Sequence, residues 1–389
     1  PRHPFRNPMA GIPVPSAPLS ALFVLGLATA CATPGRAPGT PGTDPTVRLM
    51  DTVRAHARAH GCTKSPVCSP SVALLRPEQG LDVQRLRDAG HPVVVWTVND
   101  LPTMRALLQR GVDGIISDRP DLLAQAVRDF DANADGTPGD LLDADGLIDA
   151  KRFDAQGHRG ARDLRPENTL PAFEAALDHG MTTLELDTVL TADGVPVLSH
   201  DPDLSPAKCR HADGSPLPAP VPIASLTVAR LQATYVCDRL LKDRPEQTHD
   251  RARSPEAIAF AARTGLADPY AVPTLGQVFA FAQTQSDAEH EARDPLRARN
   301  ARQVRFNVEL KRAARETPIA PAHGDAVARA ILDGGLADRA DVQSFDLRAL
   351  RSLQARHPTL RTVYLLEHLP TDADLSGLAV PTVKVEGAH

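Results

Sequence analysis

The chain has 389 residues, which is enough for one large domain or two modest ones. Its 43 Lys and Arg residues against 48 Asp and Glu residues give a formal net charge of −5, so it lacks the basic balance that binding to nucleic acid requires. An anionic small-molecule substrate is not excluded, because a bound metal ion can supply positive charge locally.

The start of the chain is typical of an export signal. Basic residues precede an apolar run over 19–30, which is too short to span a bilayer and suits the hydrophobic region of a signal peptide. Small residues before Cys31 resemble a bacterial lipoprotein processing site. We therefore expect a signal peptide over 1–31, with export to the periplasm or cell envelope and lipidation of Cys31 as the one attachment to a membrane. Cleavage without lipidation and a plain apolar helix are the alternatives.

Alternating elements follow a Pro/Gly/Thr-rich linker over 32–47. The run Val93–Trp96 is apolar and mostly β-branched, which is the pattern of a strand buried on both faces. Strand and helix then alternate, and this βαβ rhythm predicts a parallel sheet. In the segment 48–128 we predict helices over 47–60, 81–89, 101–110 and 122–127, strands over 91–99 and 111–117, and a cysteine loop between the first two helices.

The stretch 129–155 is rich in Asp and Gly and forms an acidic linker. Asp131, Asn133 and Asp135 have the spacing that starts an EF-hand loop, which makes them a candidate second calcium site. Leu142 stands where the loop would need its bidentate Glu, so a plain soluble linker is the alternative.

The alternation resumes in the main region, 156–389. A long interval over about 203–300, with proline-rich and charged patches, is predicted to be an insertion after the third strand of this region. Six strands here and two in the first part make eight. The predicted strands are 156–159, 183–187, 195–199, 305–310, 341–345 and 362–366, and the helices include 170–179, 275–283, 325–333 and 347–357.

Four cysteines remain if Cys31 is processed, an even number in an exported chain. The simplest of the three pairings joins Cys62 to Cys68 and Cys209 to Cys237. Zinc is disfavoured, because no His lies at ligand spacing beside these pairs.

Two strands carry charged residues at alternate positions. Glu185 and Asp187 are two residues apart, so their side chains point to the same face of a strand. Two neighbouring carboxylates repel unless a cation lies between them, and a hard divalent ion with oxygen ligands is the natural partner. Glu309 and Lys311 repeat the spacing, so Glu309 can complete a metal site and Lys311 can contact a phosphate oxygen.

Two histidines lie at predicted strand ends, His158 and His200. Cleavage of a phosphodiester needs a base for the attacking hydroxyl and an acid for the leaving alkoxide, and two histidines can fill both roles. Arg159 and the metal would stabilise the charge that develops on the phosphorus oxygens. The alternative for each histidine is a purely structural role.

In order and spacing, these blocks resemble the glycerophosphodiester phosphodiesterase family. The similarity covers nearly all of 156–367 outside the insertion. It is carried by His158-Arg159-Gly160, Pro166-Glu167-Asn168-Thr169, Glu185-Leu186-Asp187, His200-Asp201 and Asn307-Val308-Glu309-Leu310-Lys311, with Pro273-Thr274-Leu275 and Val342-Gln343-Ser344-Phe345-Asp346 in addition.

The resemblance implies a (β/α)8 barrel that uses calcium or magnesium to hydrolyse glycerophosphodiesters to sn-glycerol 3-phosphate and an alcohol. It implies acid/base roles for His158 and His200, phosphate contacts from Arg159 and Lys311, and metal ligation by Glu185, Asp187 and Glu309, with Glu167 as a fourth candidate. Glu167 and Asn168 could instead cap the following helix. We expect Asn168 and Trp96 to contact the substrate, with a place in the core as the alternative for Trp96.

The order of two blocks departs from the family. Residues 95–99 and 111–120 resemble its last two strands, yet they precede the first strand here. A circular permutation, the remnant of a tandem copy, or a truncated and misjoined sequence would each account for this. We favour an α/β TIM-type barrel whose last two strands come from the N-terminal part, because a barrel without them would expose open edges.

Two other functions stay open at this stage. A phospholipase or lysophospholipase D-type hydrolase would use the same residues on intact lipids. A non-catalytic envelope protein on an incomplete barrel would keep the motifs without turnover.

Overall fold

The computed structural model describes residues 44–76, 78–131, 140–312, 318–371 and 374–375. The predicted signal peptide with Cys31, most of the predicted linker, and both Asn133 and Asp135 lie outside these residues. Within the described ranges, the helices are all too short or too polar to cross a bilayer.

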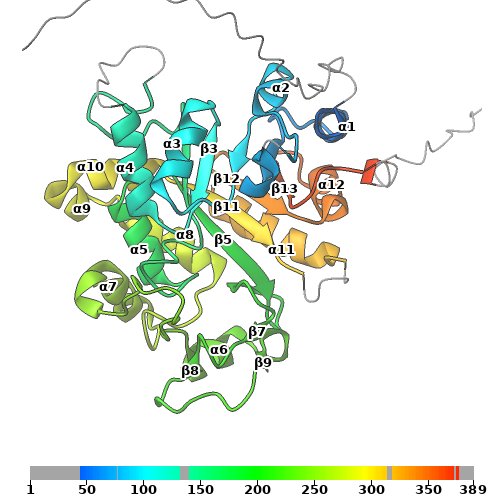
Figure 1. The fold of residues 1–389 in the computed structure, drawn as a ribbon. Helices are drawn as coiled ribbons and strands as arrows, with labels where there is room; N and C mark the ends of the chain where they lie inside the picture. The colour runs from blue at the N-terminus through cyan, green and yellow to red at the C-terminus, as the bar shows by residue number, and fades with distance from the viewer. Residues whose placement is uncertain (1–43, 77, 132–139, 313–317, 372–373, 376–389) are drawn as a thin grey trace, which may run out of the picture. The chain divides into compact units, whose positions relative to one another are not determined.

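Eight parallel strands form a barrel with helices around it (Figure 1). The ring closes between β1 and β2. There the Trp96 backbone N–H donates to the carbonyl of Pro70 at 3.1 Å, and the backbones of Cys68 and Val93 form a parallel β-bridge. Around the barrel the strands are β1 (Val67–Pro70), β13 (Arg361–Leu366), β12 (Ala340–Ser344), β11 (Arg305–Leu310), β5 (Thr183–Leu190), β4 (Asp154–Gly157), β3 (Gly114–Ser117) and β2 (Val94–Val95).

The N-terminal part closes the barrel, as the permutation account predicted, because β2 and β3 lie next to β4. It also supplies a third strand, β1, that we did not predict. This strand has only four residues and ends in a proline, so its sequence shows no clear strand pattern. The predicted strand 195–199 is not part of the ring. It contains β6 (Pro196–Leu198), which turns back at Gly194 and pairs antiparallel with β5.

Helices cover the outside of the barrel and bury a continuous apolar core against it. Most begin at an Asp or Thr whose side chain accepts hydrogen bonds from the first-turn N–H groups, which satisfies donors that the helix itself leaves unpaired. These helices are α1 (Pro45–Ala59), α2 (Val83–Asp88), α3 (Leu101–Gln109), α4 (Pro120–Phe130), α5 (Leu170–Asp178), α8 (Leu275–Thr284), α11 (Pro321–Asp333) and α12 (Leu347–Arg356), with a 3-10 turn η2 (Val72–Leu75).

Part of the insertion, residues 203–300, forms a second, smaller core with Val189 of β5 and Val197 of β6. This part lies beside the end of β5 (Figure 1). The insertion is tied to the barrel by Glu174, whose carboxylate accepts from the backbone N–H groups of Glu256 and Ala257. The insertion and the helix that runs out of it contain β7 (Asp203–Leu204), β8 (Arg210–His211), β9 (Val221–Pro222), η3 (Ile223–Ser225), α6 (Val228–Thr234), β10 (Tyr235–Val236), η4 (Arg251–Arg253), α7 (Pro255–Thr264), α9 (Ala288–Arg293) and α10 (Pro295–Gln303), in addition to α8.

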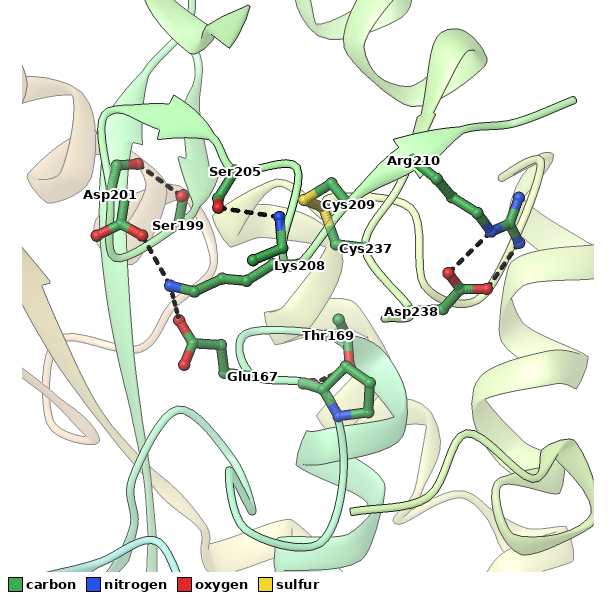
Figure 2. The surroundings of a disulfide bond; sticks show 12 residues. Glu167, Thr169, Ser199, Asp201, Ser205, Lys208, Cys209, Arg210, Cys237 and Asp238 are labelled. Carbon is green, nitrogen blue, oxygen red and sulfur yellow. Dashed lines mark hydrogen bonds and ion pairs between the residues drawn. A yellow bond between two sulfur atoms is a disulfide. The ribbon is translucent and has the colours of Figure 1, made fainter. Parts of the chain in front are cut away.

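One of the two predicted disulfides is present. Cys209 and Cys237 are bonded within the insertion, with an S–S distance of 2.06 Å (Figure 2). Cys62 and Cys68 are separate, buried thiols, so the bond predicted between them is wrong. Cys68 lies in barrel strand β1 among core side chains, and burial raises the pKa of its thiol to about 12, whereas Cys62 Sγ lies 3.5 Å from the carbonyl oxygen of Lys64.

Candidate active site

Three carboxylates converge inside the barrel. Adjacent strands β5 and β11 pair Asp187 with Glu309, and Glu185 lies two residues earlier on β5, so all three side chains face the lumen. One oxygen from each lies within 4.8 Å of the others, and the exposed fractions of the three residues are 1%, 0% and 7% for Glu185, Asp187 and Glu309. We call these residues the carboxylate triad.

Burial and mutual repulsion make the triad costly to ionise. Burial, followed by the charges of Asp187 and Glu309, raises the pKa of Glu185 well above its usual value. Burial also raises the pKa of Glu309 to about 7, although Lys311 opposes this. Burial acts in the same sense on Asp187, but Arg159 and Lys311 outweigh it and lower its pKa. Full ionisation of the triad would therefore place more negative charge in the lumen than Arg159 and Lys311 offset.

The donor set fits a divalent cation. Asp187 Oδ1 is buried and has no hydrogen-bond partner, although Lys311 Nζ lies 3.6 Å away. Carboxylate oxygens that converge from two strands are the ligands that calcium and magnesium prefer. The triad is therefore able to bind a divalent metal ion.

A layer of buried amides lies against the triad. Gln343 Nε2 donates to Glu185 Oε1 at 2.6 Å, and Asn307 Nδ2 donates to the side-chain oxygens of Gln343 and Gln156, each at 2.9 Å. These bonds fix the orientation of Glu185. We predicted no role for these amides, although polar side chains within apolar strands are the signal that could have found them.

His158 follows the end of β4 and is held by a carboxylate from the neighbouring strand. Its Nδ1 donates to Asp118 Oδ1 at 2.5 Å, and Asn99 Nδ2 donates to Asp118 Oδ2 at 2.8 Å. Burial and the nearby Arg159 lower the pKa of His158, against the raising effect of Asp118. Burial raises the pKa of Asp118, but its hydrogen bond with His158 outweighs this and the net shift is downward. Asp118 was not among the predicted site residues, although it lies in the block 111–120.

His200 lines the same cavity as His158. Its Nδ1 donates to Asp201 Oδ1 at 2.8 Å, and the second oxygen of Asp201 accepts from Lys208 Nζ at 2.7 Å. The cavity has a volume of about 930 Å³. Its walls bring together seven of the predicted site residues, which are Trp96, His158, Arg159, Glu185, His200, Glu309 and Lys311. Arg162, Asp201, Gln343 and Phe345 also line it.

The predicted phosphate-binding cations lie next to the triad. Arg159 Nε lies 3.0 Å from Asp187 Oδ2, and its backbone N–H donates to Glu185 Oε2 at 2.8 Å. Lys311 Nζ donates to Glu309 Oε1 at 2.9 Å. Both cations line the cavity, where an anionic group would find them.

Glu167 lies outside the triad, and its role as a fourth metal ligand stays a prediction. Its oxygens accept from Arg159 at 3.0 Å, Arg162 at 2.6 Å and Lys208 at 2.9 Å. Burial raises its pKa, but Arg159 and Lys208 outweigh this and bring the pKa to about 2. Glu167 is satisfied by these three cations and positions Arg159.

The two predicted substrate contacts differ in outcome. Trp96 lines the cavity, its Nε1 donates to the carbonyl of Ser69 at 2.8 Å, and its ring meets Phe345 edge-on at 5.4 Å. Asn168 does not line that cavity. Its amide is buried and pairs with Asp187, donating to Oδ2 at 2.9 Å and accepting from the backbone N–H at 3.2 Å, so it supports the triad. Asn168 lines a smaller cavity together with His200, and its contact with the substrate stays a prediction.

The candidate second calcium site is described only at Asp131. Its carboxylate accepts from the backbone N–H groups of Leu141 and Leu142 at 2.6 and 2.8 Å, which is a structural use of the charge. Nearby Asp143 and Asp145 pair with Arg299 at 2.6 and 2.7 Å. These described residues therefore have protein partners.

Comparison with known proteins places these features in a family. The model of the glycerophosphoryl diester phosphodiesterase family matches residues 40–122 and 158–389, which is more than half of the chain. The chain is 56% identical over 48 residues to glycerophosphodiester phosphodiesterase domain-containing protein 4 of Macaca fascicularis, covering 12% of this chain and 8% of that protein. It is 47% identical over 64 residues to glycerophosphodiester phosphodiesterase 1 of Rattus norvegicus, covering 16% and 18%.

The chain thus matches less than a fifth of the length of either relative. Among solved structures, it is similar to a phosphodiesterase from Oleispira antarctica in complex with the product sn-glycerol-3-phosphate. The identity is 21%, the TM-score is 0.38, and the match covers 57% of this chain and 70% of the other.

Proposed function

Because the chain belongs to the glycerophosphoryl diester phosphodiesterase family, we propose that it hydrolyses glycerophosphodiesters to sn-glycerol 3-phosphate and an alcohol, with the help of a divalent metal ion. The single observation that carries this proposal is the convergence of two histidines, two cations and the carboxylate triad on one cavity.

The proposed acid and base are His158 and His200. Asp118 and Asp201 each accept from Nδ1 of one ring, which leaves each Nε2 for proton transfer. One ring takes the proton from the attacking hydroxyl, and the other gives a proton to the departing alkoxide. Burial lowers the pKa of His158, which favours its neutral form and the role of base.

The proposed charge stabilisers are Arg159 and Lys311. Each already faces the triad and the cavity, so neither needs to move far to meet a phosphate oxygen. Glu185, Asp187 and Glu309 would hold calcium or magnesium, which supplies positive charge for the phosphodiester when bound. Asn168 and Gln343 keep two of these carboxylates in place.

The direct test is the release of glycerol 3-phosphate from glycerophosphocholine, measured with purified protein in calcium, magnesium or EDTA. We expect turnover with a divalent ion and none with EDTA. Substitution of His158 by Ala should abolish turnover and leave metal-dependent stabilisation intact. A well-folded protein that is inactive with every divalent ion tested would reject the proposal.

A lysophospholipase D-type activity is the second candidate, because the cavity also has an apolar wall. Trp96, Phe345 and Leu365 line it, and a volume of about 930 Å³ leaves room for more than a small head group. Comparison of lysophosphatidylcholine with glycerophosphocholine as substrates separates the two activities.

We also propose that the protein works outside the cytoplasm. The Cys209–Cys237 disulfide supports this, because such bonds persist in oxidising compartments. Detection of the protein in a periplasmic or envelope fraction, with or without a lipid on Cys31, tests the proposal.

A further inference from the structure

A cation from the insertion reaches the active site. Lys208 Nζ donates to Asp201 Oδ2 at 2.7 Å and to Glu167 Oε1 at 2.9 Å, as Figure 2 shows. The other oxygen of Asp201 accepts from His200. Lys208, Asp201 and His200 therefore form one continuous chain of hydrogen bonds that ends at a ring facing the cavity.

The backbone of Lys208 is fixed by its surroundings. Its N–H donates to the carbonyl of Ser205 at 3.0 Å, and its own carbonyl accepts from the N–H of Arg239 at 3.1 Å. The next residue, Cys209, is bonded to Cys237. A small cavity of about 40 Å³ is lined by Lys208, this disulfide, Asp201 and His200, so the side chain spans the short distance between the disulfide and the ring.

Without Lys208, Asp201 would be less firmly placed. Asp201 is half exposed, with 41% of its side chain accessible, and a carboxylate in such a position has several accessible rotamers. A cation that binds its outer oxygen restricts the carboxylate to the orientation in which the inner oxygen meets His200 Nδ1.

We propose that Lys208 is a positioning residue for the reaction: it holds Asp201, which orients the His200 ring and keeps the proton on Nδ1. The insertion thus takes part in the chemistry of the barrel. This inference rests on the proposed function for its kinetic readout, but not for its spectroscopic one.

A neighbouring arginine offers a matched control. Arg210 lies on the other side of Cys209 and pairs with Asp238 at 2.9 and 2.6 Å, away from Asp201 (Figure 2). Lys208→Met and Arg210→Met each remove one cation next to the disulfide. Only the first is expected to lower kcat for glycerophosphocholine, by about 10-fold with little change in KM. Lys208→Arg should restore most of the activity, because it keeps the charge.

A double-mutant cycle identifies the path. In an Asp201→Asn background, Lys208→Met should cause no further loss of kcat, because the group on which Lys208 acts is already changed. A full additional loss in the double variant would mean that Lys208 acts through Glu167 or through the fold, and the proposal would then be wrong. Equal kcat values for Lys208→Met and Arg210→Met would also overturn it. If Lys208→Met does not fold, Lys208→Gln takes its place in the same comparisons.

The ring itself supplies a readout without turnover. Nitrogen NMR of histidine-labelled protein, assigned with His200→Gln, reports which ring nitrogen of His200 carries the proton. We expect the Nδ1–H form in the native chain and in Arg210→Met, and a mixture of forms in Lys208→Met. An unchanged His200 signal in Lys208→Met would overturn the proposal. An inactive native chain that still shows the expected change in this signal would reject the proposed function alone.

Discussion

Calcium should stabilise the folded protein, and Glu309→Gln should remove most of that effect. Burial raises the pKa of Glu309 from 4.5 to about 7, although Lys311 opposes it. Such a shift corresponds to about 3 kcal/mol by which ionised Glu309 weakens the fold. Because the pKa of Glu309 is higher in the folded state, its protonated form contributes stability to the fold. This contribution is complete below about pH 4.5 and is lost as the pH rises through about 7.

The size of the metal effect follows from mass action. At pH 8, calcium at about 100 times its Kd contributes about 3 kcal/mol. In a chain of this size, that free energy corresponds to a rise in Tm of about 5 °C. Glu309→Gln removes one of the three ligands, so calcium should raise Tm by no more than about 1 °C. The metal-free variant should be more stable than the native chain at pH 8, because the ionised carboxyl is gone.

Differential scanning calorimetry at pH 8, with EDTA, calcium or magnesium, measures these shifts. Glu174→Gln is a matched control, since burial raises the pKa of Glu174 to about 7 as well. This residue does not belong to the triad, and its carboxylate accepts from the backbone N–H groups of Glu256 and Ala257 at the start of α7. The control should retain the full calcium effect. Equal calcium-induced shifts in Glu309→Gln and the native chain would refute the assignment of the triad, as would no shift in the native chain with either ion.

Three further predictions follow from single contacts. Asp118→Asn should lower kcat for glycerophosphocholine by about 100-fold at nearly constant KM, because His158 loses the carboxylate that orients it; steady-state kinetics measures this. Glu174→Gln should reduce the fall in stability between about pH 4.5 and 7, because the raised pKa of Glu174 makes its folded state favour the protonated form; urea unfolding at several pH values measures this. Trp96→Ala should raise KM for glycerophosphocholine by about 10-fold in steady-state kinetics, because the cavity loses its largest aromatic side chain. An unchanged KM would mean that Trp96 only packs in the core.

Much of the barrel and the triad could be predicted from the sequence. Residues two apart on a strand share a face, so Glu185 and Asp187 could be placed together before any coordinates existed. Strand β11 agrees with its predicted bounds, Arg305–Leu310, because its apolar pattern is interrupted only by lumen-facing residues. These features depend on local periodicity, which a single sequence displays directly.

Other features depend on pairing across the fold and could not be predicted in the same way. The strand β1 has only four residues, and β6 differs from a barrel strand only in its direction, which Gly194 reverses. Glu167 resembles a metal ligand by its position in a motif, but its ion pairs with Arg159, Arg162 and Lys208 depend on the tertiary structure, since Lys208 comes from the insertion. Cys62 and Cys68 are near in sequence, yet Cys68 belongs to a strand and its thiol packs in the core.

The permuted order matters for chemistry as well as for closure. The N-terminal part contributes Trp96 at the end of β2 and Asp118 at the end of β3, and both residues lie at the end of the barrel where the triad opens to the cavity. Because strands that are parallel bring their C-terminal ends to one side, a segment that comes first in the chain can still place its side chains beside His158. A barrel without β1, β2 and β3 would therefore lose the partner of His158 along with its edges. The loss of turnover predicted for Asp118→Asn, in a protein whose barrel remains closed, isolates this chemical contribution from the structural one.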